Sequence, residues 1–328
     1  MAKVDIIIPI YNAEKYIETT IETILKQNYD DWNLILVDDC STDKTSDICE
    51  RFALSDARIK YYKLTKNGGP SVARNVGIDK SAAEYLSFVD SDDAIEANYL
   101  SRLVTTAEEY KADVVWCNYY EEAPNGVEKR MHNLPMILLD TKQAMSFFIE
   151  GRVGLGSMCN KLYRRTFIEE HACRLNPKRM HGEDWQFNME VFRCGAKIIP
   201  ISDILYHYIR QNGHSVVASY RSIDYDNYVR SMQLKSDIAI EFGLEYNEIN
   251  VNNNFIYMVM ALLCRLAKSD YRGGKKEEFF RITNDKFFCD LLKSDLYSIA
   301  SLPLRYRVYF ALIKCRLKLL TFYLMKLF

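Results

Sequence analysis

Three aspartates stand directly after a strand-like apolar run in the segment YLSFVDSDD (85–93). Asp90, Asp92 and Asp93 are like charges in close succession, and such charges raise each other's pKa unless a cation neutralises them. A divalent metal site explains the cluster, because hard cations prefer oxygen ligands. A solvated turn explains it too, since Asp and Ser both favour turns. The segment alone leaves both interpretations open.

Polar residues also follow two other strand-like runs. Tyr11 and Asn12 come after VDIIIPI (4–10), and Asp38 and Asp39 lie in LVDDCSTDKT. The Tyr11 ring is suited to stacking on a base. A carboxylate in the second segment is suited to accepting an N–H from a pyrimidine ring. The alternatives are a half-buried tyrosine in the first case and ordinary helix capping in the second.

Two further segments place charged residues where helices are predicted to begin. KNGGPSVARNVGI contains Gly68, Gly69 and Arg74, and a glycine turn before a helix is a natural seat for phosphate. The alternative is a plain connection with a solvated arginine. MHGEDWQFN contains Glu183 and Asp184, which predict either a general base or acidic residues that stabilise a helix N-terminus.

The elements that must position these residues alternate along the first half of the chain. Strand, helix, strand repeated in this way predicts an α/β fold with a mostly parallel sheet, in which ligands bind beyond the carboxyl ends of the strands. From about residue 222 the pattern is helical. We therefore predict one domain at 1–215 and a helical region at 216–328. Strands are predicted at 4–10, 33–39, 59–64, 85–90 and 113–120, and helices near 14–27, from 44, at 69–82 and at 97–111.

Composition excludes several classes of protein. The 328 residues carry a net charge of −1, which gives no support for a nucleic-acid binder. The nine cysteines contain no C-x-x-C pair, which is typical of reduced thiols in a cytoplasm. Neither G-x-G-x-x-G nor a P-loop motif follows the first strand. No apolar run is long enough to predict a transmembrane span.

The end of the chain has a different charge balance. Residues 303–328 contain six basic residues and no acidic one. Their many leucine, phenylalanine and tyrosine residues predict an amphipathic helix, which either packs on the protein or lies on an anionic membrane surface.

Seven segments in one order resemble bacterial family 2 glycosyltransferases of the GT-A fold. They are IPIYNAEKYI, LVDDCSTDKT, NGGPSVARNVGI, FVDSDD, NKLYRR, GEDWQF and YHYIRQNGHS, and they cover roughly residues 3–216. The resemblance implies a Rossmann-like, mostly parallel sheet flanked by helices. It also implies that the N-terminal half binds a nucleotide-sugar, usually a UDP-sugar, with Mg²⁺ or Mn²⁺.

The resemblance implies a role for each matching residue. Asp184 corresponds to the catalytic base, and Asp92 to the metal ligand of the D-x-D motif. Arg210 and Ser215 correspond to an element that closes over the donor phosphates, although Tyr-His-Tyr-Ile-Arg spaces the arginine one place further on. The nucleotide-binding positions are Pro9, Tyr11 and Asn12 at the base, Asp38 and Asp39 at the uracil N–H, Arg74 near the donor, and Asp90 at the ribose or the metal.

The implied activity is transfer of a sugar, with inversion, from a UDP-sugar to a hydroxyl of a saccharide or lipid-linked saccharide. This would be a hexosyl- or N-acetylhexosaminyltransferase of surface polysaccharide synthesis, cytoplasmic and peripheral on the inner face of the membrane through residues 303–328. The alternatives are a nucleotidyltransferase of related fold and a catalytically silent nucleotide-sugar-binding scaffold at the membrane.

Overall fold

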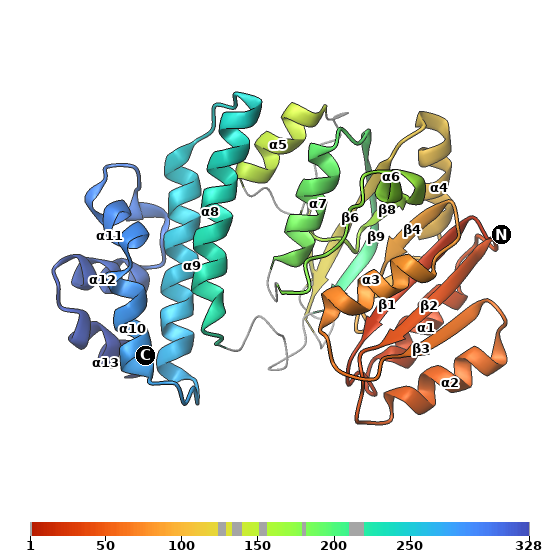
Figure 1. Ribbon diagram of the computed structural model, residues 1–328, viewed down its shortest axis with the longest axis horizontal. Coiled ribbons are helices and arrows are strands. Elements are labelled where there is room, and N and C mark those ends of the chain that lie inside the picture. Colours follow the sequence, from red (N-terminus) through yellow and green to blue (C-terminus); the bar gives the residue numbers. More distant parts are fainter. Residues whose placement is uncertain are drawn as a thin grey trace. The chain divides into compact units, whose positions relative to one another are not determined.

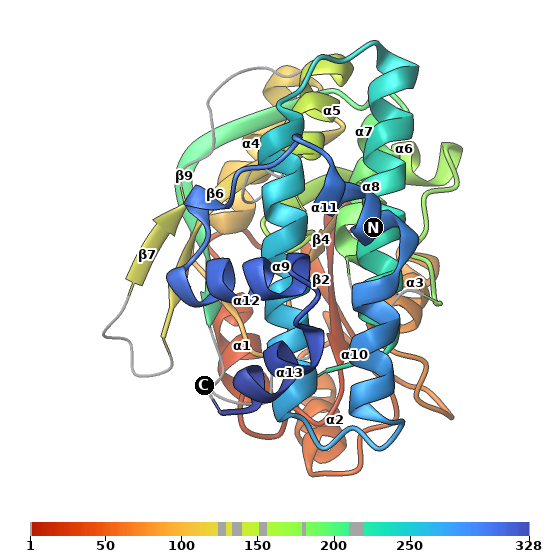
Figure 2. The same cartoon turned by 90° about the vertical axis from the view of Figure 1, so that its left-hand side faces the viewer.

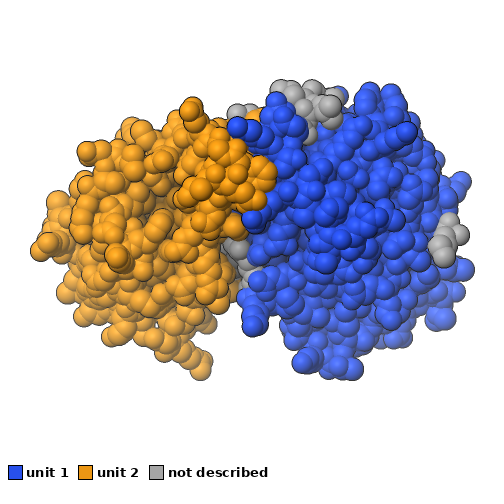
Figure 3. All heavy atoms as spheres, turned by 45° about the horizontal axis from the view of Figure 1, so that its top comes forward, with its two compact units in different colours: residues 1–145, 152–212 blue, residues 146–151, 213–328 orange. Residues whose placement is uncertain are grey.

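The computed structural model describes residues 2–123, 129–132, 140–150, 156–178, 182–209 and 220–327 (Figure 1). The chain divides into two compact units, residues 1–145 with 152–212 and residues 146–151 with 213–328 (Figure 3). The boundary predicted at residue 215 lies outside the described residues and stays a prediction.

The first unit is built on one mixed sheet with the strand order β3-β2-β1-β4-β8-β6-β9-β5, and β7 pairs with β6. The four strands β3, β2, β1 and β4 are parallel, and β9 is parallel to β6. The predicted α/β class is confirmed. The strands are β1 (Val4–Ile10), β2 (Trp32–Asp38), β3 (Ile59–Lys63), β4 (Tyr85–Phe88), β5 (Ala94–Ile95), β6 (Val114–Glu122), β7 (Lys129–His132), β8 (Lys161–Arg164) and β9 (Ile198–Ile209).

Burial explains why these segments take these forms. Every residue of β1 is buried, as expected for a central parallel strand covered on both faces. Along α1 the buried residues Ile17, Ile21 and Ile24 recur at helical spacing, and each buried aliphatic side chain stabilises by about 1.5 to 3 kcal/mol. The helices are α1 (Ile17–Leu25), α2 (Thr45–Ser55), α3 (Pro70–Lys80), α4 (Tyr99–Tyr110), α6 (Arg165–Glu170) and α7 (Glu183–Arg193), while α5 (Thr141–Glu150) is divided between the units.

One glycine sets how closely α3 approaches the sheet. A Cβ atom on Gly77 would stand 2.3 Å from Cγ2 of Ile7 in β1, so only glycine permits this contact. Arg74 lies one turn earlier on the same helix. The close packing of α3 on β1 therefore fixes the position of Arg74 relative to the carboxyl ends of the strands.

The second unit is helical throughout its described residues. Its central helix, α9, buries nine side chains along its length, and α12 and α13 lie across it (Figure 2). Asn247 caps α9 by accepting a hydrogen bond from the Asn250 N–H, which supplies a partner for one of the free N–H groups at the helix start. The helices are α8 (Ile223–Phe242), α9 (Glu248–Lys268), α10 (Lys275–Asn284), α11 (Lys286–Lys293), a 3₁₀ helix (Ile299–Ser301), α12 (Leu304–Lys314) and α13 (Lys318–Leu327).

The tail predicted as one helix consists of two. The break lies between α12 and α13, where Arg316 takes a left-handed conformation with φ of 64°. Phe310, Ile313, Phe322 and Met325 are buried in the core of the helical unit, whereas several other apolar side chains of both helices are exposed. No helix among the described residues combines the length and apolar character needed to cross a membrane.

Candidate active site

The carboxyl ends of three parallel strands bring the polar residues to one edge of the sheet. β1 pairs in parallel with β2 on one side and with β4 on the other. Tyr11 and Asn12 therefore lie at the same edge as Asp38 and as the loop that begins at Asp90. This is the edge at which ligands bind in open α/β sheets.

The Asp38 carboxylate holds its own loop together. One oxygen accepts from the Ser41 N–H at 2.7 Å, and the other accepts from the hydroxyls of Ser46 and Tyr61, each at 2.7 Å. Burial alone would raise the pKa of Asp38, but these hydrogen bonds outweigh it and place the pKa below its ordinary value. Asn12, with φ of 49°, accepts from the Thr42 N–H at 2.9 Å and ties the first loop to the second.

Asp39 connects this loop to the glycine turn. Its two oxygens accept from the N–H groups of Gly68 and Gly69, both at 2.7 Å. Gly69 has φ of 84°, a conformation that favours glycine. Tyr11 directly follows β1 with 52% of its surface exposed, whereas Pro9 is buried within the strand.

The loop after β4 is anchored by buried contacts around Asp93. Its side chain accepts from the Tyr206 hydroxyl at 2.5 Å and from the Ile209 N–H at 2.9 Å. Thr20 of α1 donates to the Asp93 carbonyl at 2.8 Å. Burial, together with Asp90 and Asp92, holds the pKa of Asp93 well above its ordinary value. Asp93 therefore positions the loop.

Asp92 has a different environment. No side chain of another described residue donates to its carboxylate, and burial together with the Asp90 charge raises the pKa of Asp92 to about 6. A carboxylate without a positive partner at this position is suited to a cation that arrives with the substrate.

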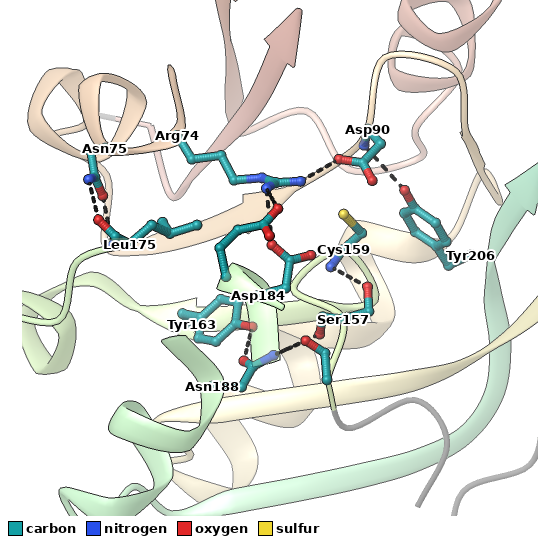
Figure 4. Close-up of polar contacts among 12 residues, drawn as sticks. Arg74, Asn75, Asp90, Ser157, Cys159, Tyr163, Leu175, Asp184, Asn188 and Tyr206 are labelled. Atoms are coloured by element: carbon teal, nitrogen blue, oxygen red, sulfur yellow. Dashed lines mark hydrogen bonds and ion pairs between the residues drawn. The ribbon is translucent and has the colours of Figure 1, made fainter. Parts of the chain in front are cut away.

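Arg74 joins three carboxylates from two distant segments (Figure 4). Its Nη2 lies 2.8 Å from an oxygen of Asp90, and its Nη1 lies 3.0 Å from Asp184 and 3.4 Å from Glu183. Only 4% of the arginine is exposed, so the guanidinium side of these charge pairs is shielded from water. Asp90 and Asp184, which are remote in sequence, are held at one point by a single guanidinium group.

A cavity of about 230 Å³ opens beside this arginine network. Asp90 and Asp184 both line it, so the end of β4 and the start of α7 face the same space. Tyr11, Asp39 and Asp92 do not line this cavity. The other lining residues are Asp93, Tyr119, Ser157, Cys159, Asn160, Tyr206 and Tyr208.

Packing beneath α7 explains how Asp184 reaches this position. Phe187 of α7 meets Phe88 of β4 and Tyr163 of β8 edge to face, with ring centroids 6.4 and 5.7 Å apart. Asn188 accepts from the Tyr163 hydroxyl at 2.6 Å and donates to the Ser157 carbonyl at 2.9 Å. The helix is thus fixed to both the sheet and the 156–160 segment, and its first turn points at the strand ends.

Burial and the charge of Arg74 act in opposite directions on the pKa values of the two acids at the start of α7. Burial raises the pKa of Glu183 to about 7, and the neighbouring Asp184 adds to the effect. Burial also raises the pKa of Asp184, but Arg74 and the Met158 N–H limit the rise. Arg74 therefore favours the ionised form of Asp184, which is the form that can accept a proton.

The family described as "Glycosyl transferase family 2" matches residues 5–172, half of the chain, in the unit that holds these groups. The chain belongs to glycosyl transferase family 2. This confirms the resemblance stated from the motifs, and the protein is a glycosyltransferase.

Two curated relatives are bacterial glycosyltransferases. EpsJ of Bacillus subtilis is 31% identical over 74% of this chain and 71% of its own length. GlyA of Streptococcus pneumoniae is 32% identical over 64% of this chain, but the match spans only 31% of GlyA.

Two solved structures share the GT-A-like fold of this transferase. Staphylococcus aureus TarS, residues 1–349 in complex with UDP-GlcNAc, has a TM-score of 0.65 at 22% identity and covers 99% of this chain and 90% of its own. The mannosyltransferase PcManGT of Pyrobaculum calidifontis, in complex with GDP-Man and Mn²⁺, has a TM-score of 0.56 at 14% identity and covers 100% of this chain and 87% of its own.

The residues of the transferase suit a divalent metal that is completed by its substrate. Within the described ranges no group of three or more potential ligands gathers as a protein cage. Mg²⁺ commonly takes only one or two carboxylates together with phosphate oxygens. The uncompensated charge of Asp92 meets that requirement.

Several residues of the site carried no assigned role at the level of sequence. Tyr206 donates to Asp93 and accepts from the Asp90 N–H at 3.2 Å, and it comes from a strand far along the chain. Lys161 is fully buried and donates to Asn160 at 3.0 Å, and burial lowers the pKa of Lys161 to about 7. Lys161 lies in the NKLYRR motif, which the sequence analysis identified without assigning a role to any of its residues. Arg210 and Ser215 lie outside the described residues.

Proposed function

We propose that this transferase moves a sugar, with inversion, from a UDP-sugar to a hydroxyl of a saccharide or lipid-linked saccharide in the synthesis of a surface polymer. The observation that carries the proposal is the joint position of Asp90 and Asp184, which line one cavity and pair with one arginine. Sugar transfer with inversion needs a donor-side acid and a general base at one site, and the shared cavity and arginine support these roles for Asp90 and Asp184.

The uracil base of the UDP-sugar donor would lie at the carboxyl ends of β1 and β2. The exposed ring of Tyr11 is available for stacking, and Asp39 has lone pairs beyond those that accept from the glycine turn. Asn12 shapes the loop after β1, Pro9 would support the base pocket from within the strand, and the hydrogen bonds accepted by Asp38 give that residue a supporting role. The TarS complex with UDP-GlcNAc supports a UDP-linked hexose or N-acetylhexosamine as donor.

Asp92 would hold the divalent metal, with Asp90 beside it. Bound there, Mg²⁺ or Mn²⁺ supplies Lewis-acid stabilisation of the charge on the departing diphosphate. The PcManGT complex with Mn²⁺ supports the use of a divalent metal. Arg210 and Ser215 would add contacts to the donor phosphates, as the resemblance implies.

Asp184 would accept the proton of the acceptor hydroxyl. The acceptor oxygen then forms its bond to the anomeric carbon as the bond to the diphosphate breaks on the opposite face. General-base assistance of this kind contributes about 10²- to 10⁴-fold to the rate. Burial raises the pKa of Asp184, and the charge of Arg74 opposes this rise and so favours the ionised form.

The helical unit would bring the enzyme to the cytoplasmic face of the membrane, where a lipid-linked acceptor is met. The support is the charge of the tail, six basic residues against no acidic ones in 303–328. Such a segment is attracted to anionic lipid by about 1 kcal/mol for each basic residue near the surface.

A screen of nucleotide-sugars with Mn²⁺ and saccharide acceptors tests the activity by measuring released UDP. We expect release from one UDP-sugar by the natural chain and a loss of about 10²- to 10⁴-fold in Asp184→Asn. Asp47→Asn, which changes an exposed acid on α2, is the matched control and should keep full activity. Release of pyrophosphate in place of UDP, or no turnover of any donor, would reject the proposal.

A further inference from the structure

The helical unit contains a second cavity, far larger than the one at the strand ends. Its volume is about 630 Å³, within the range of small-molecule sites, and every residue that lines it belongs to this unit. The wall comes from the end of α9, the turn after it and the start of α12. It combines the cations Arg265, Lys268 and Arg305 with the phenols of Tyr220, Tyr271 and Tyr306.

The charge of the wall favours an anion. Lys268 and Arg305 are exposed, and no carboxylate of the described residues forms an ion pair with either. Arg265 donates to the Tyr228 hydroxyl at 3.2 Å and lies near the buried Asp224. Among the described residues that line the cavity, Asp270 is the one carboxylate. Guanidinium groups bind phosphate oxygens through paired N–H donors, so a phosphate ester is the anion that this wall suits.

The phenols of the wall pack against other aromatic rings and against a cation. Tyr306 contacts Tyr257 edge to face with centroids 5.5 Å apart, and Tyr220 contacts Tyr271 in the same way at 5.2 Å. Arg305 lies over the Tyr306 ring at 5.0 Å. Tyrosine in this setting presents an apolar body and a hydrogen-bonding tip, as in the belts at membrane surfaces.

Exposed apolar side chains near the cavity favour the phosphate group of a membrane lipid over that of a soluble phosphate ester. Leu304 and Val308 are 75% and 47% exposed and lie four residues apart, so they share one face of α12. Arg305 follows Leu304 directly. A soluble phosphate ester would leave both apolar side chains in water, whereas a membrane lipid would bury them.

We propose that this cavity binds the phosphate headgroup of an anionic membrane lipid while Leu304 and Val308 enter the acyl boundary. The inference deepens the membrane role proposed above and rests on it. It adds one defined lipid site, made by α9 and α12, to the electrostatic attraction between the basic tail and anionic lipid.

Sedimentation with phosphatidylcholine vesicles, with and without phosphatidylglycerol, tests the site in the full-length chain. Removing two basic residues at the lipid surface should weaken binding by about 30-fold, or about 5-fold for each. The variant is Lys268→Gln with Arg305→Gln. The matched control, Lys286→Gln with Lys293→Gln, removes the same charge from exposed positions on α11. Phe287 of α11 packs on Phe255 in the first half of α9, whereas the cavity lies at the end of α9. This control should lose less than about 3-fold, because the attraction falls off within a Debye length.

A second variant tests the apolar contact. Leu304→Ser with Val308→Ser should reduce binding most at high salt, where the contribution of charge is screened. Both side chains are exposed, so the thermal midpoint should stay that of the natural chain. Leu54→Ser, at a 90% exposed position on α2, is the control and should bind as the natural chain does.

Three results would overturn the proposal: no vesicle binding by the natural chain, equal binding by the two charge variants, or complete displacement by glycerol 3-phosphate. The last would identify a site for soluble phosphate esters. UDP release measured without vesicles separates this outcome from failure of the transferase proposal. The cavity variants should retain that release, because none of their residues lies in the unit that carries Asp184.

Discussion

The loops that follow β2 and β4 both have clustered aspartates at or near their start, but the surroundings of these carboxylates differ. β2 ends at Asp38 and Asp39 follows it, whereas β4 is followed by Val89 and then by Asp90, Ser91 and Asp92. The Asp38 carboxylate is surrounded by donors of its own loop, and these place its pKa below the ordinary value. Among the described residues no side chain donates to the Asp92 carboxylate, and its pKa is raised to about 6.

The difference lies in what surrounds each carboxylate. A carboxylate whose lone pairs are filled by protein donors contributes to stability. One that is partly buried without a positive partner costs stability until a cation binds. Pairs of acids after a strand therefore do not identify a metal site, and the donors around them must be known.

Arg74→Met should have the largest effect on the folded protein. It leaves Asp90, Asp184 and Glu183 without their shared cation, and removing one partner of a buried charge network costs about 3 to 5 kcal/mol of unfolding free energy. Urea denaturation measures it. Lys80→Met, near the exposed end of the same helix, is the control and should change stability by less than about 0.5 kcal/mol. An unchanged urea midpoint for Arg74→Met would mean that the network does not hold the site together.

Asp38→Asn and Asp92→Asn should have different effects on the unfolding free energy and on UDP binding. Hydrogen bonds to a charged group contribute about 1.5 to 3 kcal/mol, so Asp38→Asn should lower the unfolding free energy by about that amount. Asp92→Asn should leave it unchanged or raise it when metal is absent. In calorimetry with Mn²⁺, the same Asp92→Asn variant should bind UDP more weakly than the natural chain. Equal losses of stability in both variants would remove the contrast between the loops.

Tyr11→Ala tests whether the loop held by Asp38 and Asp39 still flanks a ligand. A lost stack on a base costs about 1 to 3 kcal/mol, so UDP affinity should fall while the unfolding free energy stays the same. The exposed ring supports this expectation. Tyr110→Ala, which removes another exposed ring of the same unit, is the control. Normal UDP binding by Tyr11→Ala would place the nucleotide elsewhere.

The pH dependence of stability should show the smallest effect. The pKa of Asp92 is raised in the folded state, so its contribution to stability is fully present below about pH 4 and is lost as pH rises through about 6. Between pH 4 and 7 the natural chain should therefore lose about 1 to 2 kcal/mol relative to Asp92→Asn. Mn²⁺ with UDP should remove the difference. Parallel stability curves for the two proteins would contradict the raised pKa.

Local pattern was enough to predict most of the sheet. The apolar run VDIIIPI forms β1 over the residues predicted, and the other early strands and helices begin and end within a few residues of their predicted limits. The reason is that alternation of apolar runs, turn residues and caps is a short-range signal. The break in the tail was missed because Arg316 takes φ of 64° without a glycine or proline to mark it.

The sequence by itself determined which residues have chemistry available and the family to which they belong. Only the tertiary structure decided which of them meet. Arg74 and Asp184 are separated by 110 residues, and Tyr206 and Asp93 by 113, yet each pair is joined by a hydrogen bond. No spacing along a chain encodes such contacts, because they arise when parallel strands end at one edge and α7 packs on β4 and β8. Burial, neighbouring charges and hydrogen bonds then shift the pKa values of Asp38, Asp92 and Asp184, and these surroundings exist only in the folded molecule.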